Sequence, residues 1–169
     1  MSEHEGYATE LKKFPLDAAR EKELLDKQSE CVFMWTNKQG EPVGVVMCYV
    51  AAGGKIWLAL TESRARVSAV KREPRTCICV SSIGTDMKEG KTVTYKGNTR
   101  VHSYDSPEIR DWFFEALAKR LYPGDSRERI NEIAGHLRIP ERVVFEFTPI
   151  QKIAYDRDKN SFSTGLRKK

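Results

Sequence analysis

Three short runs of β-branched and aromatic residues follow one another with only tight turns between them, and this feature limits the fold more than any other. The runs are CVFMWTN at 31–37, PVGVVMCYV at 42–50 and IWLALT at 56–61, and both intervening turns contain glycine. Such runs are typical of strands, and turns this short join antiparallel neighbours. A parallel α/β fold would need a helix after each strand, so the order argues against it. The second run is almost continuously apolar, which predicts burial on both faces.

The rest of the chain adds strands and a few helices to this antiparallel start. Strand patterns recur at 75–81, 92–104, 142–149 and 151–159, with a bend expected at Gly97. Amphipathic helices are predicted at 16–27 and 126–137, and a short basic helix at 63–72. A further helix begins with the capping sequence DSPE at 105–108 and carries an apolar stripe to Leu121. We therefore predict a mainly β fold, a barrel of six or so antiparallel strands with added helices.

A chain of 169 residues is most simply one domain. We expect that domain at 16–159, after a flexible lead-in at 1–15 and before a mobile basic tail at 160–169. No apolar run approaches the roughly 18 residues that cross a bilayer. The polar N-terminus lacks the apolar segment of a secretion signal. These observations predict a cytoplasmic protein with no membrane partner.

Cysteine spacing and net charge narrow the classes of partner. The four cysteines, Cys31, Cys48, Cys77 and Cys79, each lie in a strand-like run, and none is spaced as in a zinc knuckle or a redox pair. We expect free buried thiols in a reducing compartment and no metal site. The net charge of +5 permits an anionic ligand. No nucleic-acid reading motif accompanies that charge, so nucleic acid is not an expected partner.

The turn after the third strand, Thr61-Glu62-Ser63-Arg64-Ala65-Arg66, combines hydroxyl groups and guanidinium groups at a helix start. A helix start exposes unpaired backbone N–H groups and the positive end of the helix dipole, which favour an anion. Guanidinium groups suit bidentate contact with phosphate oxygens. A capped helix with a solvated basic face has the same composition. The residues alone leave both interpretations open.

Taken in order over 16–159, these segments resemble the pyridoxamine 5′-phosphate oxidase-like superfamily of flavin-binding split barrels. The most characteristic part is Ser63-Arg64-Ala65-Arg66 followed by Arg72-Glu73-Pro74-Arg75. There the family usually has Ser-Arg-x-Lys and then Asp/Asn-Pro-Arg before a strand, so Arg66 stands where many members have lysine. The resemblance implies a split β-barrel that forms a homodimer, with cofactor clefts between the subunits.

The resemblance also implies a cofactor and its contacts. Family members bind FMN, in some branches the deazaflavin coenzyme F-420, and in a few cases heme or nothing. The phosphate would be cradled by Thr61, Ser63, Arg64 and Arg66. The backbone of Val45, Val46 and Met47 would lie along the isoalloxazine ring, unless these residues are plain core, and Ser81 and Ser82 would approach from the side.

The function expected from the resemblance is a flavin-dependent oxidoreductase that transfers hydride to or from a small organic substrate. A deazaflavin-dependent reductase and a non-catalytic flavin or heme protein are the alternatives. The longer acidic tail of a deazaflavin would favour extra cations, for which Lys71, Arg72 and Arg75 are candidates unless they are simply solvated. The C-terminal segment DRDKNSFSTGLRKK has no tryptophan of the kind that grips substrate in vitamin B6 oxidases. No residue stands out as catalytic, and His102 on a strand is interpreted as structural.

Overall fold

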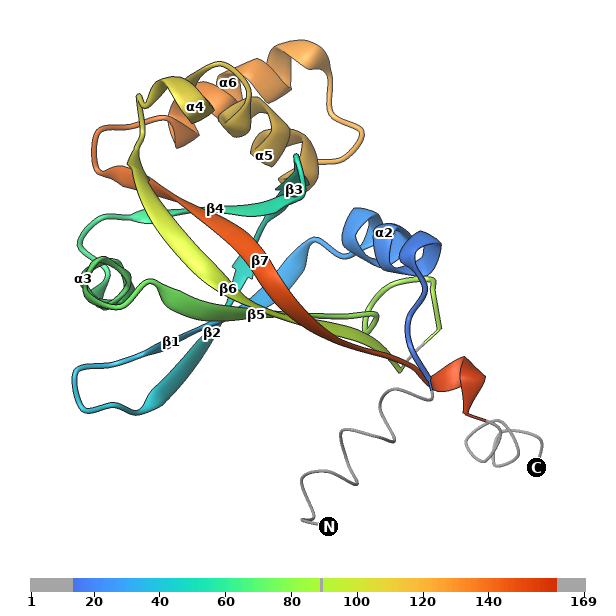
Figure 1. The fold of residues 1–169 in the computed structure, drawn as a ribbon. Helices are drawn as coiled ribbons and strands as arrows, with labels where there is room; N and C mark the ends of the chain where they lie inside the picture. Colours follow the sequence, from blue (N-terminus) through green and yellow to red (C-terminus); the bar gives the residue numbers. More distant parts are fainter. Residues whose placement is uncertain (1–13, 89, 161–169) are drawn as a thin grey trace.

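The computed structural model describes residues 14–88 and 90–160. Within them, seven strands form one antiparallel sheet in the order β2-β1-β5-β6-β7-β4-β3. The strands are β1 (Glu30–Thr36), β2 (Pro42–Cys48), β3 (Val50–Ala52), β4 (Lys55–Thr61), β5 (Arg75–Ser81), β6 (Lys91–Ser103) and β7 (Arg142–Asp156). The sheet curls until β2 and β4, which form no ladder with each other, come within 8 Å at their Cα atoms (Figure 1). The predicted split β-barrel is confirmed.

The helices lie where the sequence predicts them, with small shifts at their ends. They are α2 (Ala18–Lys27), α3 (Ala65–Arg72), α4 (Pro107–Arg110), α5 (Phe113–Leu121) and α6 (Arg127–Leu137), with a 3₁₀ turn, η1, at Arg157–Lys159. The side chains of Asp17 and Ser126 accept hydrogen bonds from backbone N–H groups in the first turns of α2 and α6. The single helix expected at 105–121 is two helices, because Trp112 takes a non-helical backbone conformation between them.

The expectation that 42–50 is one strand buried on both faces is wrong. The chain pairs with β1 as far as Cys48 and then changes partner, so that Val50 begins β3 and pairs with β4. Strand β2 lies at one edge of the sheet, and its Val46 is 62% exposed. A continuous apolar run does not reveal this, because strand order depends on contacts far along the chain.

The predicted strands at 142–149 and 151–159 are one long strand, β7, that pairs with β6 from Val143 to Asp156. The part predicted beyond Asp156 is not strand but the 3₁₀ turn η1. The register shifts between Lys96 and Gly97, where Gly97 faces Pro149. A Cβ atom at Gly97 would overlap the carbonyl oxygen of Thr148 and lie 2.8 Å from a ring carbon of Phe147. The bend predicted at Gly97 is therefore a β-bulge that needs glycine.

Two apolar clusters stabilise the fold. The barrel interior contains Phe33, Leu58, Ile78, Val93, Phe145 and Phe147, with Leu24 of α2 closing one end. A second cluster lies between the outer face of the sheet and the helices α4 and α5, and includes Trp57, Ile109, Phe113, Leu117 and Val144. Helices α4–α6 thus cover one outer face, while α3 lies apart from them at the β4–β5 connection (Figure 1).

The ends of the described chain meet. The carbonyl oxygen of Phe14 accepts a 2.8 Å hydrogen bond from the N–H of Asp156, and Lys159 donates to the carbonyl oxygen of Pro15. The rest of the expected lead-in, residues 1–13, and of the expected tail, residues 161–169, lies outside the described residues.

All four cysteines are free thiols, although only Cys31 is fully buried. Burial, followed by the neighbouring thiols Cys48 and Cys79, raises the pKa of Cys31 to about 12. This thiol is therefore protonated, and unreactive as a nucleophile, near neutral pH.

Candidate functional site

The turn between β4 and α3 leaves a helix start uncapped by any side chain. Arg64 is the N-cap residue with an extended backbone, and its N–H donates to the carbonyl oxygen of Thr61 at 3.1 Å. No side chain accepts a hydrogen bond from the first turn of α3, and that turn contains no acidic residue. Its free N–H groups and the helix dipole therefore favour an anion.

Arg66 carries the clearest sign of a missing partner. Its Nε atom is buried and has no hydrogen-bond partner. Burial, and then the adjacent charge of Arg64, lower the pKa of the Arg66 guanidinium. Within residues 14–88 and 90–160, no carboxylate forms an ion pair with either arginine. The nearby acids are already engaged, Glu62 by Lys71 at 3.0 Å and Glu73 by Arg75 at 2.7 Å.

Thr61 and Ser63 complete this turn. Thr61 is half-buried at the end of β4, and Ser63 is exposed. In the described part of the chain neither hydroxyl has a hydrogen-bond partner. The turn thus brings together two unpaired guanidinium groups and two free hydroxyls, and this set fits a phosphate group.

The predicted ring contacts lie on β2. Val45 is half-buried, Val46 is exposed and Met47 is buried. Because β2 pairs with β1 on one side only, alternate backbone groups of this strand face away from the ladder. Some Cα atoms of β2 also lie within 8 Å of β4, the strand that leads into the α3 turn.

Ser81 and Ser82 lie at the other end of β5, beside α2 (Figure 1). The hydroxyl of Ser82 donates to the carbonyl oxygen of Lys88 at 2.8 Å and accepts from the N–H of Lys91. The hydroxyl of Ser81 accepts from the N–H of Ile83 at 3.2 Å. Within one chain these serines are therefore not brought to the α3 turn, and their role toward a cofactor stays a prediction.

Sequence reasoning missed Arg142, the first residue of β7. It faces Thr61 in the antiparallel β4–β7 ladder. Its Nε atom is also buried without a hydrogen-bond partner. The sequence offers no signal for this position, because the pairing joins segments eighty residues apart and an arginine at a strand start usually faces solvent.

His102 belongs to a different cluster, under helices α4 and α5. Its Nε2 atom lies 2.6 Å from Oε2 of Glu146, and Lys55 also contacts that carboxylate. Burial opposes ionisation of Glu146, but the hydrogen bonds from Lys55 and His102 outweigh it and lower its pKa. The interpretation of His102 as a structural residue agrees with this paired, buried position.

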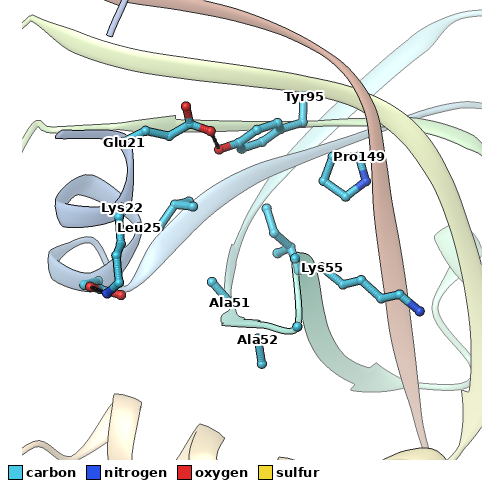
Figure 2. A pocket seen from close by; sticks show the side chains of 12 residues that line it. Glu21, Lys22, Leu25, Ala51, Ala52, Lys55, Tyr95 and Pro149 are labelled. Atoms are coloured by element: carbon cyan, nitrogen blue, oxygen red, sulfur yellow. Dashed lines mark hydrogen bonds and ion pairs between the residues drawn. The ribbon is translucent and has the colours of Figure 1, made fainter. Parts of the chain in front are cut away.

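A cleft of about 410 Å³ lies between α2 and the β3–β4 turn. Figure 2 shows Tyr95 and Glu21 pointing toward each other at its floor, where the Tyr95 hydroxyl donates to Glu21 at 2.6 Å. Lys152 pairs with the same carboxylate, and at the rim Lys22 pairs with Asp26. Because Lys55 is likewise paired with Glu146, every charged side chain that lines this cleft already has a partner, and the cleft is a poor site for a phosphate.

A smaller hollow of about 290 Å³ adjoins α3 itself. It lies between the β1–β2 turn and the helix, and its lining includes Trp35, Ala65 and Arg72. Arg72 donates to the carbonyl oxygen of Thr36 at 3.1 Å. One aromatic side chain, Trp35, thus lines a hollow beside the helix whose start carries the unpaired arginines.

No group of three or more histidine, cysteine, aspartate or glutamate side chains in residues 14–88 and 90–160 is arranged to hold a metal ion. In the same residues, no helix is both long enough and apolar enough to span a bilayer.

Comparison with known proteins identifies the family to which the chain is similar. The family model described as pyridoxamine 5′-phosphate oxidase matches residues 19–153. No curated protein matches the chain significantly.

Solved structures of the same fold include proteins with different ligands. A conserved hypothetical protein of Mycobacterium tuberculosis aligns with a TM-score of 0.74 at 16% identity, covering 88% of this chain and 89% of that one. An F-420 reductase aligns with a TM-score of 0.56 at 17% identity, covering 78% and 94%. The heme storage protein HutZ of Vibrio cholerae aligns with a TM-score of 0.63 at 14% identity, covering 82% and 94%. At these identities the likeness shows the fold alone.

Proposed function

The chain belongs to the pyridoxamine 5′-phosphate oxidase family, and from that premise we propose that it is a flavin-dependent oxidoreductase. It binds FMN at a cleft of a homodimer and transfers hydride to or from a small organic substrate. The bound flavin supplies the hydride chemistry, while the protein binds and orients it. Such an enzyme needs no catalytic side chain of its own, which agrees with a chain in which none stands out as catalytic.

The observation that carries the proposal is the buried, unpartnered Nε of Arg66 beside Arg64. An unpaired buried N–H group costs free energy, so such a group persists where a ligand satisfies it. Arg64 and Arg66 hold the phosphate, and the hydroxyls of Thr61 and Ser63 add donors. The backbone of Val45, Val46 and Met47 lies along the ring, and Ser81 and Ser82 approach the cofactor from the side.

The other basic side chains near the turn favour FMN over a deazaflavin, because each of them already has a partner. Lys71 is paired with Glu62, Arg75 with Glu73, and Arg72 with the carbonyl oxygen of Thr36. Three side chains already engaged in this way are poor candidates for holding a long acidic tail. A deazaflavin-dependent reductase, by analogy with the F-420 reductase of the same fold, remains the alternative.

A non-catalytic heme protein, by analogy with HutZ, is less favoured. Heme iron usually takes an axial ligand such as histidine. His102 is buried and bonded to Glu146, and His136 is exposed on α6. Neither lies at the α3 turn.

The homodimer is supported by an exposed apolar row on the outer face of the sheet. In register across five strands lie Val46, Val32, Cys79, Thr94 and Ile153. Val46 is 62% exposed, Val32 36% and Ile153 42%. Cys79 and Thr94, between them, are half-buried. Exposed apolar side chains gathered on one face are typical of interfaces. We call these five residues the outer row.

Replacing Arg64 and Arg66 together by alanine tests the proposal. Loss of two charge-assisted contacts should weaken FMN binding by about 100-fold or more, measured by quenching of flavin fluorescence. Arg129→Ala, which removes a paired arginine on α6, is the matched control. An unchanged FMN affinity in the double variant would contradict the proposal.

Reduction of the bound flavin by NAD(P)H, followed by its reoxidation with an acceptor, would distinguish an enzyme from a non-catalytic carrier.

A further inference from the structure

We propose that Arg142 determines the specificity of the anion site, and that the site selects a doubly charged phosphate monoester over a singly charged phosphodiester. The inference rests on the proposed function, because it concerns the phosphate assigned to Arg64 and Arg66. It adds a third guanidinium group from a strand that follows the α3 turn by almost eighty residues.

The sheet holds Arg142 against the base of that turn. Arg142 and Thr61 are direct partners in the antiparallel β4–β7 ladder. Their side chains therefore lie on the same face, with Cα atoms roughly 5 Å apart. One residue further on, the N–H of Glu62 donates to the carbonyl oxygen of Glu141 at 2.8 Å. The start of β7 and the α3 turn are thus fixed to each other by the backbone.

The Arg142 side chain lacks an internal partner. It is half-buried, and its Nε atom is enclosed without any hydrogen bond. In the described part of the chain no carboxylate pairs with it. Arg120 also has a buried, unpartnered Nε, but its other nitrogens donate to the carbonyl oxygens of Leu25, Asp26 and Gln28. Arg142 has no such anchor, so an acceptor from a ligand satisfies it best.

Charge matching defines the class of ligand. Three guanidinium groups stay positively charged at any relevant pH. A phosphate monoester carries a charge of about −1.5 to −2 at pH 7, with a second ionisation near pH 6, whereas a diester carries one charge. Because Coulomb attraction scales with the charge of the ligand, each guanidinium group attracts the dianion about twice as strongly as the monoanion, so Arg142 adds to the preference for the monoester.

Other titratable groups lie around the turn. The carboxylates at this end are Glu62, paired with Lys71, Glu73, paired with Arg75, Glu141, and Asp105, which accepts from the hydroxyl of Ser103. The nearest histidine along the β6–β7 ladder, His102, faces Val144 and is bonded to Glu146. Riboflavin, which lacks the phosphate, reports any change that arises from these groups.

The experiment measures the affinity of FMN, of its methyl phosphodiester and of riboflavin by fluorescence quenching between pH 5 and pH 8. We expect the wild-type protein to bind FMN about tenfold or more tightly than the diester at pH 7.5, and to lose that preference toward pH 5. Arg142→Gln should reduce the preference to less than about threefold, with riboflavin unaffected. Arg142→Lys keeps the charge and should retain most of it. Arg129→Gln, which removes one charge on α6, should retain all of it.

The outcomes separate this inference from the proposed function. A wild-type protein that binds both FMN forms equally, or an Arg142→Gln variant that keeps the preference, overturns the role of Arg142 and leaves the FMN site standing. A wild-type protein that binds neither form overturns both. Thermal unfolding of each variant, followed by circular dichroism, shows whether it is folded. If Arg142→Gln does not fold, loss of the preference in the charge-retaining Arg142→Lys variant overturns the inference.

Discussion

At the scale of single residues, the arginines of this chain differ in whether an acceptor faces them. Arg20, Arg75 and Arg129 each pair with a carboxylate within 3 Å. Arg66 and Arg142 pair with none in the described residues, although each has a buried nitrogen. A buried N–H group without a hydrogen-bond partner lowers the free energy of unfolding. We therefore expect that these two arginines are kept for ligand binding at a cost in stability.

Arg66→Met tests this opposition. Methionine fills similar space without an unsatisfied N–H group, so the protein without cofactor should gain about 1 kcal/mol in free energy of unfolding. The same variant should bind FMN about tenfold or more weakly. Urea unfolding gives the first quantity and flavin fluorescence the second.

The control is Arg120→Met, which loses the contacts with three carbonyl oxygens and the stacking on Tyr49 at 4.8 Å. It should lose about 2 kcal/mol. If both variants lose stability, Arg66 is an ordinary structural arginine.

The buried carboxylate of Glu146 gives a prediction about pH. Because its pKa in the folded protein is lowered below the unfolded value, its ionised form stabilises the fold at neutral pH. That contribution is complete above about pH 4.3, the ordinary pKa of glutamate, and is lost as the pH falls through the lower folded value. Glu146→Gln should therefore cost about 2 kcal/mol at pH 7, and the difference from wild type should shrink below about pH 4. Urea unfolding at pH 7, 5 and 3.5 measures it; a difference that is constant with pH would contradict the assignment.

At the scale of elements, the β6–β7 ladder depends on one small residue. Gly97→Ala would place a methyl group against the carbonyl oxygen of Thr148 and the ring of Phe147. Backbone cannot move aside as a flexible side chain can, so we expect a loss of about 3 kcal/mol or more. Gly135→Ala on α6 is the control, since a Cβ there meets nothing within 4 Å. It should gain about 0.5–1 kcal/mol from helix propensity. Thermal unfolding compares the two; equal effects would show that the bulge tolerates a side chain.

The elements also show where prediction from sequence succeeds. The turns, the helix positions and the bend at Gly97 depend largely on neighbouring residues, and they were predictable. The cap predicted at 105–108 falls on Ser106, whose side chain makes no capping hydrogen bond. The exposure of β2 and the change of partner after Cys48 depend on which strands meet across the sheet. The same limit applies to the site. Thr61, Ser63, Arg64 and Arg66 are local in sequence, whereas Arg142 joins them only through the β4–β7 register.

At the scale of the whole molecule, two regions of the outer surface of the sheet differ in whether helices cover them. Helices α4–α6 cover the face around Trp57 and Val144 (Figure 1). The outer row, in contrast, exposes Val46, Val32 and Ile153. The proposed dimer covers this row, and a cofactor cleft between subunits then depends on it.

Ile153→Asp tests that dependence at the end of the outer row farthest from β2. A charge buried in an apolar interface without a partner costs about 3 kcal/mol or more per copy. We therefore expect the mass measured by light scattering to fall from twice 19.3 kDa to 19.3 kDa. Ile150→Asp, on a residue that is 71% exposed and outside the row, should leave the dimer intact.

The two readouts together locate the cofactor. If the cleft lies between subunits, Ile153→Asp loses FMN binding although Arg64 and Arg66 are untouched, and the loss reverses at protein concentrations high enough to restore the dimer. A monomer that keeps full FMN affinity would place the whole site within one chain. A variant that stays dimeric would show that the outer row is not the interface.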